Sequence, residues 1–253
     1  MASIRSLASC IGVTGEFSVL RHFLGFHDFR VPVDPHAKTI VVDGGLVRTN
    51  RLTVSLRRQF SLLHGPHFHL NLTMMGTLAP YDELDFCVFK VRDIYAQVGV
   101  GVGRIEYFRV PSSELGALGF PTSEDDFDTI GHTWVVPGDG IGVNVVGESA
   151  VRSDGHWVMG KSPQPGPCED DKDEKGYNSS VVSMSSVQAI TPTKEELSAH
   201  TFAHEIGHYL GLEHVDDQSN LMSPVATDPA NENGLTGDQR DTILDHCLMK
   251  PGC

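Results

Sequence analysis

The sequence has no long apolar run and few positive charges. Across its 253 residues, no uninterrupted apolar stretch reaches the roughly 18 residues that would suggest a transmembrane helix. Lysine and arginine together number 19 against 33 aspartates and glutamates, which gives a net charge of −14 at pH 7. Because nucleic-acid binding depends on clustered Lys and Arg, we expect no nucleic acid as partner. The lack of a long apolar stretch likewise indicates that no membrane is a partner. A hydrophobic content of 40% is normal for a globular protein.

Cysteine is scarce, and its count is odd. An odd number leaves at least one thiol unpaired or bonded to another molecule. Cys247 and Cys253 are close enough in sequence to bridge, and Cys168 could reach the C-terminal region, so the sequence leaves the pairing open. Cys10 is expected to be a small buried side chain. The five cysteines are Cys10, Cys87, Cys168, Cys247 and Cys253.

The most informative stretch is HEIGHYLGLEH, at residues 204–214. If 194–210 is helical, His204 and His208 share one face and can bind one zinc ion. A third ligand, His214, would lie too far along a continuing helix, so the chain must turn, and Gly211 permits the left-handed conformation that ends helices. Glu205 adjoins the first ligand and is suited to accept a proton.

The pattern HExxHxxGxxH, followed by a methionine-containing turn at 220–224, resembles the metzincin clan of zinc endopeptidases. The resemblance implies a zinc ion held by His204, His208 and His214. It also implies that Glu205 takes a proton from the zinc-bound water and passes it to the departing amine.

The turn itself is NLMSP, with the methionine at position 222. By resemblance, Met222 packs beneath the zinc ligands without binding the metal. Pro224 and Val225 would then border the pocket for the substrate side chain after the cleaved bond. Because Pro224 stands where some metzincins have a tyrosine, no tyrosine ligand is expected, and the subfamily stays open.

The same resemblance implies an α/β (α+β) fold. We expect a twisted, mostly parallel sheet with one antiparallel edge strand, a covering helix, an active-site helix, and a small C-terminal subdomain with a terminal helix. Residues 1–65 are interpreted as a β-rich extension and 66–253 as the peptidase domain, divided into 66–214 and 215–253. Hydrophobic patterns and breakers predict helices at 80–95, 194–210 and 235–249, strands at 70–74, 100–111, 141–149, 156–162 and 178–187, and loops at 112–139 and 163–175.

Three other polar groups are candidate sites of lesser promise. His64, His67 and His69 cluster locally, and the two on one strand face suggest either a second metal site or a satisfied strand face. Two acidic stretches are interpreted as solvated loops, with calcium as the alternative. Asp216 or Asp217 would either orient an imidazole or belong to a polar loop. The acidic stretches contain Glu124, Asp125, Asp126 and Asp128, and Asp170, Asp171, Asp173 and Glu174.

The leading hypothesis is a zinc endopeptidase that acts on proteins or peptides. The alternatives are a binding protein that keeps the zinc scaffold without turnover, and a zinc hydrolase of non-peptide amides or esters. The first residues are too poor in charge and apolar length to predict a signal peptide. Since metzincins are mostly secreted, we expect an extracellular protein whose leader has been removed. The sequence leaves the oligomeric state open.

Overall fold

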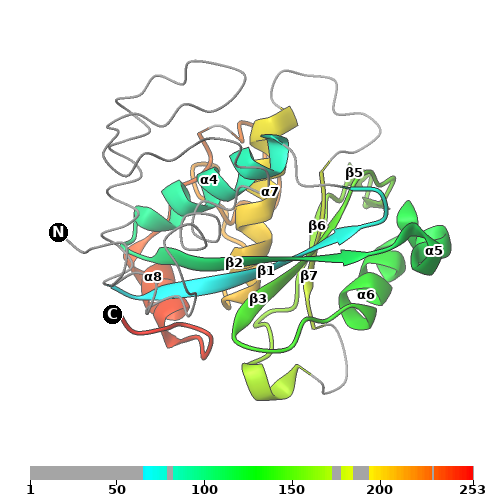
Figure 1. The fold of residues 1–253 in the computed structure, drawn as a ribbon. Coiled ribbons are helices and arrows are strands. Elements are labelled where there is room, and N and C mark those ends of the chain that lie inside the picture. The colour runs from blue at the N-terminus through cyan, green and yellow to red at the C-terminus, as the bar shows by residue number, and fades with distance from the viewer. Residues whose placement is uncertain (1–64, 79–81, 173–177, 185–193, 230, 253) are drawn as a thin grey trace, which may run out of the picture.

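A five-stranded sheet forms the centre of the molecule in the computed structural model, which describes residues 65–78, 82–172, 178–184, 194–229 and 231–252. Its strand order is β2-β1-β3-β7-β6. All neighbouring pairs are parallel except β6–β7, which is antiparallel (Figure 1). The predicted mostly parallel sheet with one antiparallel edge strand is confirmed. The strands are β1 (His67–Met75), β2 (Gly101–Val110), β3 (Gly140–Val146), β6 (Gly160–Lys161) and β7 (Ser180–Ser183).

Two long helices, α4 (Asp82–Ala96) and α7 (Lys194–Tyr209), pack against one face of this sheet. Alternate residues of β1 point toward them because side chains in a strand alternate between faces. These residues, with the inward positions of both helices, form the main core. Both predicted helices are confirmed. The core residues of β1 are Phe68, Leu70, Leu72 and Met74.

The opposite face is covered by α5 (Ser112–Leu115), the 3-10 turn η1 (Gly116–Gly119) and α6 (Glu124–Thr133). The prediction that 112–139 is loop-like is therefore wrong over much of its length. Ser123 caps α6 in a capping box with Asp126, and Phe127 and Ile130 are fully buried in a second core cluster. The acidic residues at 124–128 belong to the first turns of this helix, where negative charge is favourable.

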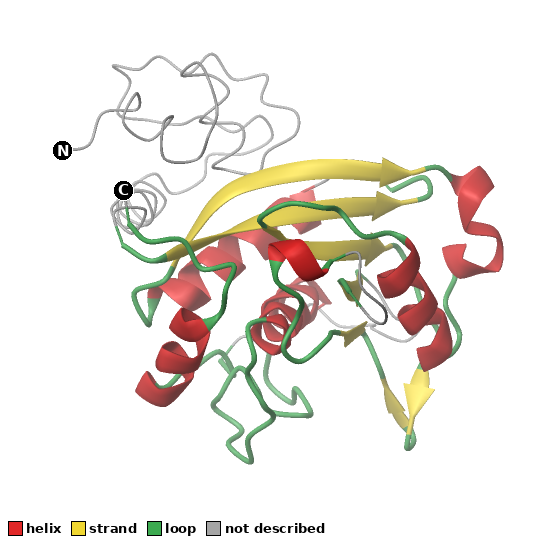
Figure 2. Ribbon diagram, turned by 90° about the horizontal axis from the view of Figure 1, so that it is seen from below, coloured by secondary structure: helices red, strands yellow, loops and turns green. Residues whose placement is uncertain are grey.

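The edge strand is shorter than predicted. Of residues 156–162, only Gly160–Lys161 pairs with β7. β5 (His156–Trp157) instead forms a two-stranded hairpin with β4 (Arg152–Ser153), at whose turn Asp154 and Gly155 both have positive φ. Because of this turn, residues 156–157 pair with 152–153 and not with β7. Two short pairs of strands therefore replace the single predicted edge strand. The hairpin lies apart from the main sheet in Figure 2.

The C-terminal part consists of loops and α8 (Gly237–Asp245). Thr236 caps α8 in a capping box with Gln239. Cys168 and Cys247 form a disulfide, which decides the pairing left open by the sequence, while Cys87 is buried in the main core. The predicted loop 163–175 contains a short 3-10 turn, η2 (Glu169–Asp171).

Several predictions lie outside the described residues. They include the N-terminal extension as far as residue 64, with Cys10 and His64, and the first two residues of the helix predicted at 80–95. Asp173 and Glu174 of the second acidic stretch and Cys253 also lie outside. The division into subdomains stays a prediction. In the described part of the chain, no helix is both long and apolar enough to span a membrane.

Candidate active site

Helix α7 carries the first three residues of the motif. Its apolar side faces the main core through Ala199, Phe202, Ala203, Ile206 and Leu210, as predicted from the helical spacing. Burial of that side fixes the rotation of the helix about its axis. The rotation places His204 and His208, one turn apart, next to each other, with ring centroids 4.6 Å apart.

The chain turns immediately after α7. Gly211 has φ +94°, a conformation that L side chains rarely adopt, and its N–H donates to the carbonyl of His208. Leu212 N–H donates to the carbonyl of Gly207, so the turn closes tightly on the last helical residues. His214 is thereby carried back: its Nε2 lies 3.2 Å from His204 Nε2 and 3.1 Å from His208 Nε2. The predicted turn at Gly211 is confirmed.

Backbone carbonyls orient two of the three imidazoles. His204 Nδ1 lies 2.8 Å from the carbonyl oxygen of Leu221, and His208 Nδ1 lies 2.8 Å from that of Leu212. A carbonyl oxygen can only accept, so each Nδ1 carries the hydrogen and each Nε2 presents a lone pair. Neither carbonyl was identified from the sequence, because a backbone oxygen leaves no signature in residue type.

The three Nε2 atoms fit a zinc ion. One hydrogen on His214 Nε2 satisfies only one of its two contacts, whereas a cation among the three nitrogens satisfies all of them. Zinc–nitrogen bonds of about 2.0–2.1 Å in a tetrahedron separate the ligand atoms by roughly 3.3 Å, close to the spacing found here. Burial lowers the pKa of His204 to about 3 and of His208 to about 4, and also lowers the pKa of His214. All three are therefore neutral near pH 7, the form that binds metal.

Glu205 is buried beside the triad. Burial raises the pKa of its carboxyl to about 8, and its Oε2 has no hydrogen-bond partner among the described residues. The backbone of Gly160 in the edge strand β6 lies directly against it, since a Cβ on Gly160 would stand 2.5 Å from Glu205 Cγ and Oε1. The sequence analysis missed this contact. Its signal was a glycine inside a strand pattern, which often marks close approach of another group.

Met222 is fully buried beneath the helix, as the resemblance implies. Its Sδ would lie 2.6 Å from a Cβ at Gly207, so the glycine within the motif makes room for the thioether. Asn220 Oδ1 accepts from Met222 N–H and also from Gln239 Nε2, while Asn220 Nδ2 donates to Gln239 Oε1. Gln239, the capping-box partner of Thr236, therefore also holds the methionine turn.

Other candidate residues lie away from this triad or have other partners. Asp217 accepts from Ser219, and backbone carbonyls occupy the orienting positions of His204 and His208, so neither Asp216 nor Asp217 orients those two imidazoles. Pro224, the last residue of the methionine turn, and Val225, which follows it, are exposed. His200 is buried against Asn233.

The other predicted metal sites are not supported. His69 Nδ1 accepts from Arg104 N–H, and its Nε2 faces Asp139, so it is a satisfied strand histidine. Lys161 pairs with Glu124 and Asp128 on α6. Within the described ranges, the triad is the only group of three or more His, Cys, Asp or Glu residues placed to share an ion, so calcium has no support.

A histidine triad that fits zinc, formed by helix α7 and the turn after it next to a buried glutamate, beside a mostly parallel sheet, is the arrangement of a metallopeptidase. The family model described as Matrixin matches residues 119–245, about half of the chain. The chain therefore belongs to the matrixin family and, with it, to the metzincin clan of zinc metallopeptidases. Zinc is the metal expected for this family, and a peptidase family implies a protein or peptide substrate.

Solved structures show more distant likeness. An archaemetzincin from Methanopyrus kandleri is 17% identical with a TM-score of 0.47, covering 69% of this chain and 93% of that one. An archaemetzincin from Archaeoglobus fulgidus is 14% identical with a TM-score of 0.42, covering 68% and 99%. Metalloproteinase-II from Bacteroides fragilis is 18% identical with a TM-score of 0.44; the match covers 70% of this chain and only 53% of that one. No curated protein matches the chain.

Proposed function

We propose that this protein is a zinc-dependent endopeptidase in which His204, His208 and His214 hold the metal. The observation that carries the proposal is the convergence of three Nε2 atoms beside a buried carboxyl: those of His204 and His208 lie 3.2 and 3.1 Å from that of His214. A zinc ion bound there supplies Lewis acidity, which lowers the pKa of a water molecule and polarises a substrate carbonyl.

Glu205 is the proton carrier in this proposal. It takes a proton from the attacking water and passes it to the departing amine, so its carboxyl must both accept and release a proton near neutral pH. Burial supports this role, because it raises the pKa of the carboxyl to about 8. The backbone at Gly160 limits where the carboxyl can lie, which keeps it beside the histidines.

The substrate is proposed to be an extended peptide that adds a strand to β6. This strand is the last in the sheet order, and its Gly160 lies in contact with Glu205. A chain that pairs with that edge through backbone hydrogen bonds would pass close to the proton carrier without a side-chain code. Pro224 and Val225, both exposed, are the proposed border of the pocket for the residue after the cut.

The decisive experiment is cleavage of denatured casein with and without a zinc chelator. We expect the chelator to abolish cleavage and added zinc to restore it. Glu205→Gln should retain zinc and lose activity by roughly 10²–10⁴-fold, the usual contribution of general acid–base catalysis. Glu213→Gln is the matched control, because Glu213 is an exposed carboxyl in the same motif, and it should cleave normally.

Three outcomes would contradict the proposal in different ways. Wild-type rates from Glu205→Gln would exclude its role in proton transfer. Stoichiometric zinc binding without cleavage of casein, gelatin or a mixed peptide library would favour a silent binding scaffold. Hydrolysis of small esters or amides without any peptide cleavage would favour a different zinc hydrolase.

A further inference from the structure

The C-terminal end of helix α7 is held by a segment that lies outside the zinc motif. This clamp segment, Pro165–Cys168, runs across Tyr209, the last residue of the helix. Gly166 N–H donates to the carbonyl of Tyr209 at 2.8 Å, and the Tyr209 hydroxyl donates to the carbonyl of Pro167 at 3.0 Å. One of the carbonyls that a helix end leaves without an intrahelical partner is thereby satisfied.

The contact is also a close steric one. A Cβ on Gly166 would stand 2.3 Å from two atoms of the Tyr209 ring, far inside van der Waals contact, so the backbone of the clamp segment lies flat on the ring. Tyr209 is fully buried between this segment and the core. Pro165 reaches onward to the turn, where its Cβ is 3.8 Å from the position that a Cβ on Gly211 would take.

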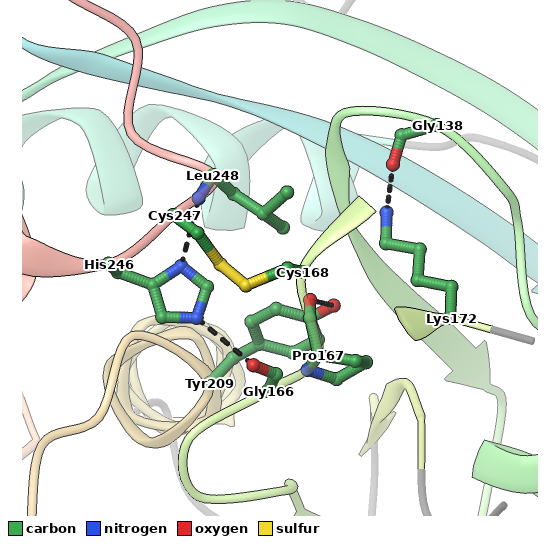
Figure 3. The surroundings of a disulfide bond; sticks show 9 residues. All are labelled: Gly138, Gly166, Pro167, Cys168, Lys172, Tyr209, His246, Cys247 and Leu248. Atoms are coloured by element: carbon green, nitrogen blue, oxygen red, sulfur yellow. Dashed lines mark hydrogen bonds between the residues drawn. A yellow bond between two sulfur atoms is a disulfide. The ribbon is translucent and has the colours of Figure 1, made fainter. Parts of the chain in front are cut away.

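The clamp segment is fastened to the C-terminal part of the chain. Cys168 is bonded to Cys247, which lies 79 residues later in the sequence. His246 Nδ1 accepts from Leu248 N–H, so its Nε2 carries the hydrogen and donates to the carbonyl of Gly166 at 3.1 Å. In Figure 3, Gly166 and Pro167 lie beside the Tyr209 ring, and His246 and the disulfide lie close to the same ring.

The residues downstream of the disulfide are fixed as well. The buried ammonium of Lys172 donates to the carbonyls of Gly138 and Gly140, which precede and begin β3 (Figure 3). The clamp segment is therefore attached to the C-terminal tail through Cys168, and the chain that follows it is attached to the sheet through Lys172. These two attachments fix the position of the clamp segment against the helix end.

The position of this helix end affects all three histidines. Tyr209 follows His208 directly and precedes Gly211 by two residues, so a shift of its ring moves both the second histidine and the turn that returns His214. We propose that the clamp segment, through Tyr209 and the Cys168–Cys247 disulfide, is a positioning element that sets the spacing of the three zinc-binding imidazoles. This inference rests on the proposed zinc site, and metal sites tolerate only small errors in ligand position.

Zinc affinity of the intact, folded chain tests the proposal. The double variant Cys168→Ala, Cys247→Ala should bind zinc about 10–100-fold more weakly than the wild type, the range seen when groups that orient metal ligands are removed. Tyr209→Phe deletes only the hydroxyl and keeps the ring, so it should weaken zinc binding by up to about 10-fold and is the variant to use if the double variant does not fold. The cobalt(II) form of each variant should show a changed visible spectrum, which reports ligand geometry rather than stability.

The matched control is Ser123→Ala, which removes the cap of α6 and lowers stability without touching the clamp segment. It should bind zinc and give the cobalt spectrum of the wild type. If Tyr209→Phe does the same, and any folded double variant does too, the clamp segment only stabilises the fold and the inference is overturned. A wild-type chain that binds no zinc would instead remove the proposed function, so the two failures are distinguishable.

Discussion

At the scale of single residues, the site depends on glycines, which have no side chain, as much as on the histidines and the glutamate. Gly207 leaves room for Met222, Gly166 for the ring of Tyr209, and Gly160 for the carboxyl of Glu205. Of the four glycines at the site, only Gly211 has a positive φ. The motif pattern identifies Gly211, whereas the other three are explained only by what lies against them in space.

Gly160→Ala should reduce turnover without removing the metal. The added Cβ would lie 2.5 Å from Glu205 Cγ and Oε1, and the end of a flexible side chain yields before backbone does. Because a misplacement of about 1 Å in a catalytic group costs on the order of 100-fold, we expect kcat to fall by that order while zinc content stays stoichiometric. Gly119→Ala is the control, since its Cβ would approach nothing closer than 3.8 Å. An unchanged kcat would show that Glu205 is not confined by the edge strand.

At the scale of elements, the sequence predicted the long helices and strands and missed the short ones. Helix α6 contains only two large buried side chains, Phe127 and Ile130, among four acidic residues, so its local pattern resembles a solvated loop. Packing of those two side chains on the sheet stabilises the segment as a helix. The predicted edge strand was too long for the opposite reason. The apolar pattern of 156–162 does not reveal the turn at Asp154 and Gly155, which directs the first half of this segment into a hairpin.

The cap of α6 should carry a measurable share of stability. Ser123 Oγ accepts from Asp126 N–H, and the Asp126 carboxylate accepts from Ser123 N–H. Ser123→Ala should lower the free energy of unfolding by about 1 kcal/mol in urea titrations. Thr129→Ala, an exposed position inside the same helix, should change it little, because alanine favours helix interiors. Equal losses from both variants would argue against capping as the cause.

At the scale of the whole molecule, the C-terminal tail closes onto the start of the sheet. Lys250 and His67 exchange backbone hydrogen bonds, and Lys250 Nζ lies 3.2 Å from Asp139. Asp139 also pairs with Arg104 and faces His69. Burial by itself would raise the pKa of Asp139, but these neighbouring positive groups lower it to about 2. This polar group therefore joins residues from β1, β2, the start of β3 and the tail.

Stability should fall as the pH drops from about 6.5 to about 4, in part through His69. Burial, with smaller effects of Arg104, His67 and Lys250, lowers its pKa from 6.5 to about 4, against the opposing effect of Asp139. Between about pH 4 and 6.5, the unfolded chain therefore binds a proton at His69 that the folded chain does not. The contribution of His69 to the free energy of unfolding is complete above about pH 6.5 and lost below about pH 4. It amounts to roughly 3 kcal/mol at most.

The measurement compares the pH dependence of unfolding for the wild type and His69→Asn, both without zinc. Asparagine keeps an acceptor for Arg104 N–H but does not titrate. The triad histidines titrate equally in both proteins, so the difference between the two curves isolates His69. Parallel curves between pH 4 and 6.5 would show that His69 does not couple protonation to folding.

The sequence alone determined what is local or periodic: the helix that spaces two histidines by one turn, the glycine that ends it, and the other long helices and strands with clear hydrophobic patterns. Such features depend on a few neighbouring residues and their steric preferences. Tertiary structure alone decided the pairing of Cys168 with Cys247, the carbonyls of Leu212 and Leu221 that orient two imidazoles, and the contacts of Gly160 and Tyr209. These depend on which distant backbone atoms meet in a close-packed interior, and residue type carries no record of that.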